Sequence, residues 1–179
     1  MFVRRPPLSL ELEHMIVLGI DPGMADTGFG VVAAHGSRLE AVDHGVLSTA
    51  AGDAAEARLC ELQEQLSAVL GRHAPEAVAI EDLYIGANPR TILSVGQARG
   101  AILAACGAAG VSVESYAPAQ IKSAVCGFGR ADKGQVARMV TAILGIDARG
   151  PGSHAADALA AAVCHAQMSR TSRLRAGAR

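Results

Sequence analysis

Aromatic residues are scarce in this chain of 179 residues, which has no Trp, two Tyr and three Phe. Half of its residues are nevertheless hydrophobic, so the core must be built from Ala, Val, Leu and Ile. A chain of this length is long enough to bury a sizeable core as one domain. The sequence therefore predicts a single folded domain of ordinary size.

Signals for membrane insertion, secretion and zinc binding are also missing. No uninterrupted apolar run reaches the roughly 18 residues that a membrane-spanning helix needs. The first residues place prolines and acids where a signal peptide has an apolar stretch. The four cysteines lie far apart, without a C-x-x-C pair, which argues against a zinc-ribbon site. We expect buried, reduced thiols in a cytoplasmic protein.

Charge is distributed unevenly, although the formal net charge is only −1. Residues 1–117 carry 7 basic and 14 acidic side chains, whereas residues 118–179 carry 9 basic and 3 acidic ones. A basic last third can present a positive face to a polyanion; alternatively, its terminal arginines only solubilise a frayed tail. We assign residues 1–14 to a disordered extension or to a misplaced start codon before Met15, 15–168 to the folded domain and 169–179 to a basic flexible tail.

Hydrophobic periodicity and chain breakers predict the order of the elements. Strands are expected over residues 15–20, 29–34, 39–48, 77–80 and 111–116. Helices are expected over about 53–71, 88–109, a short stretch from 118, 132–144 and 153–168. A strand that follows a helix implies a crossover, so strand 77–80 should run parallel to the first strand. This order predicts an α/β fold, a mixed five-stranded sheet with helices on both faces.

Capping residues and glycines add detail to this prediction. Asp53 with Glu56, then Asp132 and Ser153, are expected to cap the starts of three helices. Gly96 and Gly100 lie four residues apart on one helix, where each glycine costs about 1 kcal/mol relative to Ala. We therefore expect another backbone to come close to them, either the sheet or a partner helix.

Two buried strands end in an acid. Asp21 follows the first apolar run and Glu81 follows the fourth strand, so adjacent strands would bring the carboxylates together. His154 and Asp157, three residues apart on one face of the last helix, could then lie over them. Clustered carboxylates repel one another unless a cation neutralises them, and their oxygens suit Mg²⁺ or Mn²⁺. A pair of such ions can cleave phosphodiesters.

Each of these residues also has an ordinary structural explanation. Asp21 precedes Pro22-Gly23 and can serve a turn, and Asp157 is favoured near a helix N-terminus by the helix dipole. Glu81 can be a solvated strand end and His154 a first-turn residue. Taken together, these explanations do not account for acids that end two otherwise apolar strands. The glycines at 23, 28 and 30 are expected to let the second strand turn back without crowding the ions.

Six short motifs carry a family resemblance: VLGIDPG at 17–23, TG-G-V over 27–31, AIED at 79–82, GQARG at 96–100, the segment of Lys122 and Lys133, and AADALA at 155–160. Over about residues 15–167 the chain resembles the RuvC-type Holliday-junction resolvases, bacterial enzymes with a ribonuclease-H-like fold. The resemblance implies a homodimeric, metal-dependent endonuclease that nicks two strands of like polarity across a four-way DNA junction and leaves 5′-phosphate ends. It also implies the junction-binding protein RuvA and the branch-migration protein RuvB as partners.

The resemblance assigns roles within the acidic site. Asp21, Glu81 and Asp157 would be ligands of two Mg²⁺ or Mn²⁺ ions, with Asp21 bridging them. His154 stands where many members of the family carry Asp. A neutral imidazole suits Mn²⁺ better than Mg²⁺, and it could instead act as a general base on the attacking water.

The resemblance also implies a DNA-binding set. Lys122 and Lys133 are the only two lysines in the chain and match positions that contact phosphate near the cut; Arg130 lies between them. Tyr84 matches an aromatic position that stacks on an unpaired base. The alternatives are two ordinary surface lysines and a core tyrosine.

Two other functions stay open at this point. The first is a catalytically silent junction-binding protein, in which His154 has removed the chemistry. The second is a ribonuclease-H-like enzyme that trims ribosomal RNA precursors, which shares the first strand motif. The lysine segment and the GQARG helix favour the junction resolvase over the RNA-processing enzyme.

Overall fold

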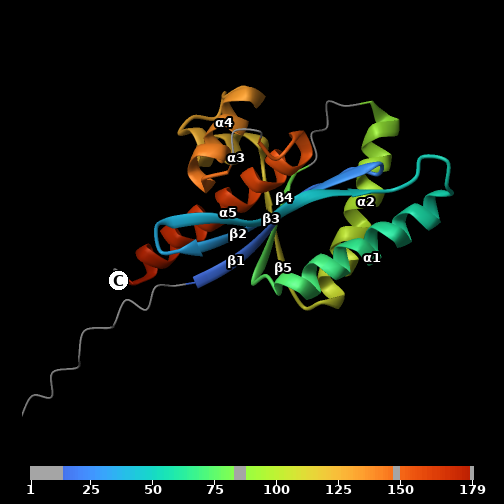
Figure 1. Ribbon diagram of the computed structural model, residues 1–179, viewed down its shortest axis with the longest axis horizontal. Coiled ribbons are helices and arrows are strands. Elements are labelled where there is room, and N and C mark those ends of the chain that lie inside the picture. The colour runs from blue at the N-terminus through green and yellow to red at the C-terminus, as the bar shows by residue number, and fades with distance from the viewer. Residues whose placement is uncertain (1–13, 83–87, 147–149, 178–179) are drawn as a thin grey trace, which may run out of the picture.

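The computed structural model describes residues 14–82, 88–146 and 150–177. At its centre lies one five-stranded sheet with the strand order β3-β2-β1-β4-β5 (Figure 1). Strand β2 pairs antiparallel with both β1 and β3, whereas β4 pairs parallel with β1 and β5 parallel with β4. The predicted mixed sheet and the parallel fourth strand are therefore confirmed. The strands are β1 (His14–Asp21), β2 (Asp26–His35), β3 (Arg38–Ser48), β4 (Ala77–Glu81) and β5 (Ser112–Tyr116).

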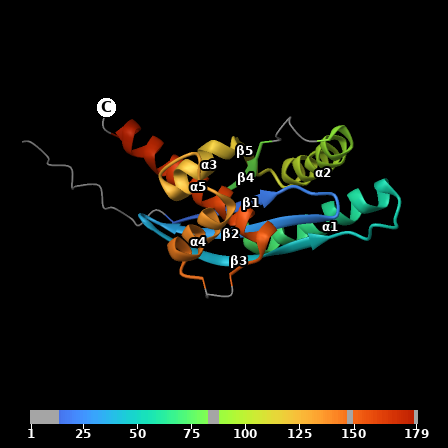
Figure 2. The same cartoon turned by 90° about the horizontal axis from the view of Figure 1, so that it is seen from above.

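Helices cover both faces of this sheet, as predicted. On one face lie α1 (Ala55–His73) and α2 (Pro89–Ala108), which also pack on each other. On the other face α5 (Ser153–Gly177) lies directly on β1 and β2, and it is covered in turn by α3 (Pro118–Cys126) and α4 (Lys133–Leu144) (Figures 1 and 2). Helix α5 is thus enclosed between the sheet and two shorter helices.

Strand β1 contributes to both hydrophobic cores because successive side chains point to opposite faces. Val17 belongs to the core with α5, whereas Leu18 and Ile20 belong to the core with α1 and α2. All three are fully buried, as expected of a central strand covered on both faces. By the same alternation, Gly19 and Asp21 face α5.

The predicted helix caps had different outcomes. Asp132 accepts the Gln135 amide N–H, and the Gln135 side chain accepts the Asp132 amide N–H, so this capping box is confirmed. Helix α1 instead follows Ala54 and has no side-chain cap, because Asp53 lies one residue too early to reach the first free amides. Ser153 is the first helical residue rather than the cap.

Helix α5 is also longer than predicted. It continues to Gly177, whereas the sequence analysis ends it near Met168 and treats residues 169–179 as a flexible tail. Residues 169–176 contain neither glycine nor proline, so nothing in them terminates a helix before Gly177. The predicted extension of residues 1–14 lies almost wholly outside the described residues, although β1 already begins at His14.

No disulfide joins the four cysteines, in agreement with the expectation of reduced thiols. Cys106 and Cys164 are buried, and burial raises the pKa of each thiol to about 11. Cys126 is half-buried and Cys60 is exposed, so the expectation that the thiols are buried holds for only part of the set.

Candidate active site

Glycines on β1 and β2 let the start of α5 lie directly on the backbone of the sheet. A Cβ atom at Gly19 would collide with the Ala158 carbonyl oxygen, and one at Gly28 would collide with the His154 carbonyl oxygen. No larger residue fits either position while α5 stays where it is. These two contacts fix how far Asp157 stands from the strand ends.

The role of these glycines differs from the role predicted from sequence. The prediction was that they let the second strand turn back without crowding the ions, and this suits Gly23 alone, where a Cβ would collide with the Asp26 carbonyl. Gly28 and Gly30 lie within β2 rather than in the turn. A Cβ at Gly30 would press on the side chain of Leu159 in α5, so both positions serve the approach of that helix.

The turn after β1 is held from two sides. The buried Thr27 hydroxyl donates to the Gly23 carbonyl at 2.7 Å and accepts the Gly23 amide N–H at 3.3 Å. From the other side the Met24 carbonyl accepts hydrogen bonds from the Thr49 hydroxyl at 2.6 Å and from Arg58 at 3.1 Å. The acid at the end of β1 is therefore presented by a turn with little freedom.

Three acids meet at this end of the sheet. Asp21 ends β1 and Glu81 ends β4, and these two strands pair in parallel with Ile20 opposite Ile80. Asp157 comes from the start of α5. Burial is the main cause that raises the pKa of Asp21, and the charge of Asp157 raises it further, while the His154 hydrogen bond opposes them. The pKa of Glu81 is also raised, mainly by burial and to a smaller extent by the negative charges of Asp21 and Asp157.

Basic side chains approach the same acids. His154 Nδ1 lies 2.8 Å from the Asp21 Oδ2 atom, and Lys133 Nζ lies 2.7 Å from the Asp157 Oδ2 atom. The hydrogen bond with Asp157 is the main cause that raises the pKa of Lys133. Lys122 is also close, because its charge and that of Lys133 lower the pKa of Glu81.

The structure thus brings together six of the residues that the sequence analysis selected: Asp21, Glu81, His154, Asp157, Lys122 and Lys133. Arg130 lies exposed between α3 and α4, in the loop that precedes Lys133. Tyr84 lies outside the described residues, so its predicted stacking role stays a prediction.

The site suits a divalent cation in charge and in donor type. Within residues 14–82, 88–146 and 150–177, no three His, Cys, Asp or Glu side chains are arranged to hold a metal ion as they stand. One oxygen of Asp21 faces an imidazole and one oxygen of Asp157 faces an ammonium group. Burial, and then repulsion by the neighbouring carboxylates, nevertheless raises the pKa values of Asp21 and Glu81, and a hard cation would relieve that repulsion. Such an ion would compete with His154 and Lys133 for the same oxygens.

Sequence reasoning missed one residue beside the site. Arg99 of α2 donates from Nη1 to the Glu81 carbonyl oxygen at 3.0 Å and from Nη2 to the Asp82 carboxylate at 3.4 Å. The GQARG motif had drawn attention to its glycines only. The available signal was that Arg99 is the only charged residue between Thr91 and Ala108.

Comparison with known proteins decides the family. The family model described as "Crossover junction endodeoxyribonuclease RuvC" matches residues 17–165. The chain belongs to the RuvC family. This membership confirms the resemblance carried by the sequence motifs, and it places the chain among the crossover junction endodeoxyribonucleases, which are metal-dependent nucleases.

Individual members of the RuvC family are similar in sequence to this protein along most of the chain. The crossover junction endodeoxyribonuclease RuvC of Syntrophomonas wolfei is 42% identical over 158 residues, which are 88% of this chain and 92% of the relative. That of Rubrobacter xylanophilus is 45% identical over 157 residues, 88% of each chain. The structure of T. thermophilus RuvC in complex with a Holliday junction substrate matches with a TM-score of 0.85 and 41% identity, covering 89% of this chain and 97% of the other. The ribonuclease-H-like α/β fold is thereby confirmed.

Proposed function

We propose that this protein resolves four-way DNA junctions in recombination and repair, by nicking two strands of like polarity and leaving 5′-phosphate ends. The observation that supports this most directly is the convergence of Asp21, Glu81 and Asp157 at one end of the sheet with Lys122 and Lys133 beside them. Acids that repel one another favour binding of cations, and the lysines next to them favour binding of phosphate.

The acids would hold two divalent ions, Mg²⁺ or Mn²⁺. When bound, such ions supply a deprotonated water as nucleophile and neutralise charge on the leaving oxygen. Asp21 and Glu81 are positioned by neighbouring strands and Asp157 by α5, so the three ligands stand on rigid elements. A hydrogen bond from His154 Nδ1–H to the Asp21 carboxylate leaves Nε2 with a lone pair, as a ligand or as a base for the attacking water.

The basic residues would hold the DNA. Lys122, Arg130 and Lys133 lie on or between α3 and α4, where they would contact phosphates on either side of the cut. Lys133 now bonds to Asp157, and we infer that it moves to a phosphate when a cation takes over the Asp157 oxygens. Tyr84 is proposed to stack on an unpaired base at the crossover.

The decisive experiment incubates the purified protein with an end-labelled four-way junction, and with a linear duplex of the same sequence, in Mn²⁺. The wild type and Glu40→Gln, an exposed acid at the other end of the sheet, should nick the junction at paired sites and spare the duplex. Asp21→Asn should bind the junction in Ca²⁺ but leave it uncut. Equal cutting by Asp21→Asn would refute the assigned site, and binding without cutting by the wild type would favour a silent junction-binding protein.

The choice of metal forms a second part of the proposal. A site with one imidazole among its ligands carries less negative charge and suits Mn²⁺ better than Mg²⁺. Cleavage should therefore be faster in Mn²⁺, and His154→Asp should shift the preference toward Mg²⁺. Equal rates of the wild type in the two metals, or a Mg²⁺ preference, would contradict this part.

We further propose that two copies pair through α2. By length and composition, Thr91–Ala108 is long and apolar enough to span a membrane, with a mean hydropathy of 1.2, yet only 22% of it is buried. The apolar character of this helix was not evident from sequence, because single polar residues interrupt its apolar run. Leu93 and Leu103, 66% and 42% exposed, continue the stripe of Gly96 and Gly100 at helical spacing.

The structure favours one of the two explanations offered for these glycines. Among the described residues, a Cβ atom built on Gly96 or Gly100 meets no atom within 4 Å apart from nearby backbone of α2 itself, so the backbone expected near them is not the sheet of the same chain. A helix of a second copy would fit that apolar, glycine-lined stripe, and a dimer would present two active sites for the two nicks. Leu103→Glu should convert a dimer to a monomer in sedimentation velocity, whereas Val46→Glu, an equally exposed apolar side chain on β3, should leave the dimer intact.

RuvA and RuvB are proposed as partners in the cytoplasm. The proposal is supported by family membership. Recruitment of the wild type to a junction by RuvA and RuvB, measured by co-sedimentation, tests it. If this protein binds the junction less when RuvA and RuvB are added, they compete with it for the junction instead.

A further inference from the structure

Arg99 is the only charged side chain of α2 beyond its first turn, which contains Arg90. No other Asp, Glu, Lys or Arg lies between Thr91 and Ala108, and the Arg99 side chain is only 16% exposed. Burial of a charge is unfavourable unless the charge is paired and hydrogen-bonded. The partners of Arg99 therefore indicate why α2 carries it.

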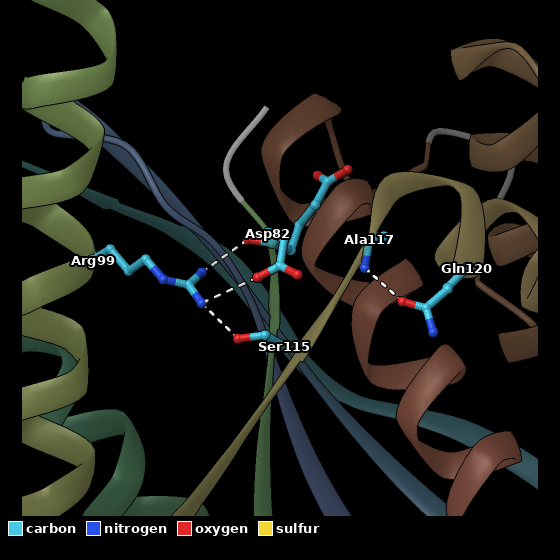
Figure 3. Close-up of polar contacts among 6 residues, drawn as sticks. Asp82, Arg99, Ser115, Ala117 and Gln120 are labelled. Atoms are coloured by element: carbon cyan, nitrogen blue, oxygen red, sulfur yellow. Dashed lines mark hydrogen bonds and ion pairs between the residues drawn. The ribbon is translucent and has the colours of Figure 1, made fainter. Parts of the chain in front are cut away.

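These partners lie together at the ends of two strands. The guanidinium group donates to the Glu81 carbonyl oxygen at 3.0 Å, to the Asp82 carboxylate at 3.4 Å and to the Ser115 hydroxyl. Figure 3 shows Arg99 extending from its helix toward Asp82 and Ser115. The guanidinium group donates to these acceptors from two separate nitrogen atoms of its planar fork, whereas a lysine ammonium donates from a single nitrogen.

The peptide group that follows Glu81 is held at both ends. Its carbonyl oxygen accepts from Arg99, and its amide N–H, which belongs to Asp82, donates to the Tyr116 carbonyl of β5 at 2.9 Å. Rotation of this peptide would turn the Glu81 side chain away from Asp21, because the direction of a side chain follows the backbone of its residue.

Because side chains alternate between the two faces of the sheet along β4, Arg99 contacts the main chain of Glu81 but lies on the face opposite to its carboxylate. Glu81 faces α5 and the other acids, whereas Asp82 faces α2 and the guanidinium group. Arg99 thus holds the main chain of the proposed metal ligand from the opposite face of the sheet, without occupying the oxygens that the ion needs.

We propose that Arg99 is a positioning residue, which orients Glu81 for metal binding by holding the Glu81–Asp82 peptide from α2. The inference rests on the proposed role of Glu81 as a ligand. It predicts that Arg99 variants weaken metal binding to the free protein, since loss of a residue that orients a ligand typically lowers metal affinity about 10- to 100-fold.

The test measures Mn²⁺ binding to the metal-free protein by electron paramagnetic resonance, in the absence of DNA. Arg99→Gln should weaken Mn²⁺ binding about 10-fold, and Arg99→Lys should weaken it less, because the ammonium still reaches one acceptor. Ser115→Ala keeps the Glu81 contact and should bind Mn²⁺ like the wild type. All three should bind a four-way junction in Ca²⁺ as the wild type does, and saturating Mn²⁺ should restore part of the lost cleavage rate.

Two controls separate positioning from general stability. Arg72→Gln removes an arginine of α1 whose guanidinium lies 3.6 Å from Asp43 on the edge strand β3, and it should not change Mn²⁺ binding. Glu81→Gln should weaken Mn²⁺ binding at least as much as Arg99→Gln does. Thermal melting of every variant shows whether it is folded, and Arg99→Lys provides the measurement if Arg99→Gln does not fold.

The possible outcomes distinguish this inference from the proposed function. If Glu81→Gln weakens Mn²⁺ binding but both Arg99 variants bind like the wild type, the positioning role is wrong and the active site stands. If Arg72→Gln weakens binding as much as Arg99→Gln does, Arg99 acts only through stability and the inference also fails. If Glu81→Gln binds Mn²⁺ like the wild type, the proposed ligand itself is wrong.

Discussion

The two faces of the sheet are packed by different means, although the same strands build both. On the α5 face, Gly19 and Gly28 bring backbone against backbone, and residues 155–166 of α5 are buried apart from the half-buried Asp157. On the other face, large side chains such as Leu18, Leu62 and Leu66 fill the space between the sheet and α1. The α5 face is therefore closely packed and rich in alanine, whereas the other face is packed with large side chains.

The two kinds of packing contribute differently to hydrophobic stabilisation and to the spacing of the backbones. Burial of a Leu or Ile side chain contributes about 1.5–3 kcal/mol, so most hydrophobic stabilisation per residue comes from the face with α1 and α2. Small residues contribute less, but they fix the separation of two backbones to within a fraction of an ångström. The acids and His154 all stand on or face the close-fitting side.

An added methyl group should destabilise the protein most strongly on the α5 face. Gly19→Ala places a Cβ against the Ala158 carbonyl and should lower the free energy of unfolding by about 4 kcal/mol or more, because a backbone cannot yield as a side chain does. Gly107→Ala on α2, with open space around it, should raise that free energy by up to about 1 kcal/mol. Urea denaturation of both variants checks this, and equal effects would remove the distinction between the faces.

Truncation on the α1 face should lower stability without changing the chemistry. Leu66 is fully buried there, so Leu66→Ala should lower the free energy of unfolding by about 3 kcal/mol. The cleavage rate of the folded protein, measured well below its melting temperature, should stay within about twofold of the wild-type rate, since no acid of the site stands on that face. A loss of rate at full folding would show that the two faces are not separable in this way.

Charge on the α5 face should destabilise the metal-free protein at neutral pH. The pKa values of Asp21 and Glu81 are raised above their ordinary values of 3.8 and 4.5. Folding therefore favours their protonated forms, and the resulting stability is present below those ordinary values and is lost as the pH rises through the raised ones. Asp21→Asn should melt at a higher temperature than the wild type at pH 7 in EDTA.

Metal should reverse this effect. Added Mn²⁺ stabilises whichever form binds it, so it should raise the melting temperature of the wild type more than that of Asp21→Asn. The exposed-acid variant Glu40→Gln should behave like the wild type in both conditions. A lower melting temperature of Asp21→Asn in EDTA would mean that the hydrogen bond with His154 outweighs burial.

Helix caps should give the smallest effects, of opposite sign on the two faces. Asp132→Ala removes the cap of α4 and should lower the free energy of unfolding by about 1 kcal/mol. Ala54→Ser supplies the side-chain cap that α1 lacks and should raise it by a similar amount. Thermal melts of the two single variants test both signs, and additive effects are expected in the double variant because the sites are independent.

Much of the candidate site could be predicted from local patterns. An apolar strand that ends in an acid, as at Asp21 and Glu81, is visible without a structure, and so is the spacing of His154 and Asp157 on one helix. The cap at Asp132 was predictable for the same reason. Each of these features depends on residues within a few positions of one another.

Contacts between distant segments were not predictable in this way. Gly28 in β2 is small because of His154, more than a hundred residues away, and the sequence analysis attributed it to the neighbouring turn. The predicted role of Lys133 in DNA binding gave no sign of its pairing with Asp157. Arg99 was visible as an isolated charge, but nothing in the sequence indicated that its partner is a main-chain carbonyl.

The family, the mixed α/β fold and the candidate acids could be predicted without a structure, because strand periodicity, chain breakers and short motifs are local properties of the chain. Three features of the site became visible only in three dimensions. Gly19 and Gly28 let α5 lie against the sheet, Lys133 pairs with Asp157, and α2 holds Glu81 through Arg99. The physical reason is that steric fit and hydrogen bonding act over a few ångströms in space, whatever the separation along the chain.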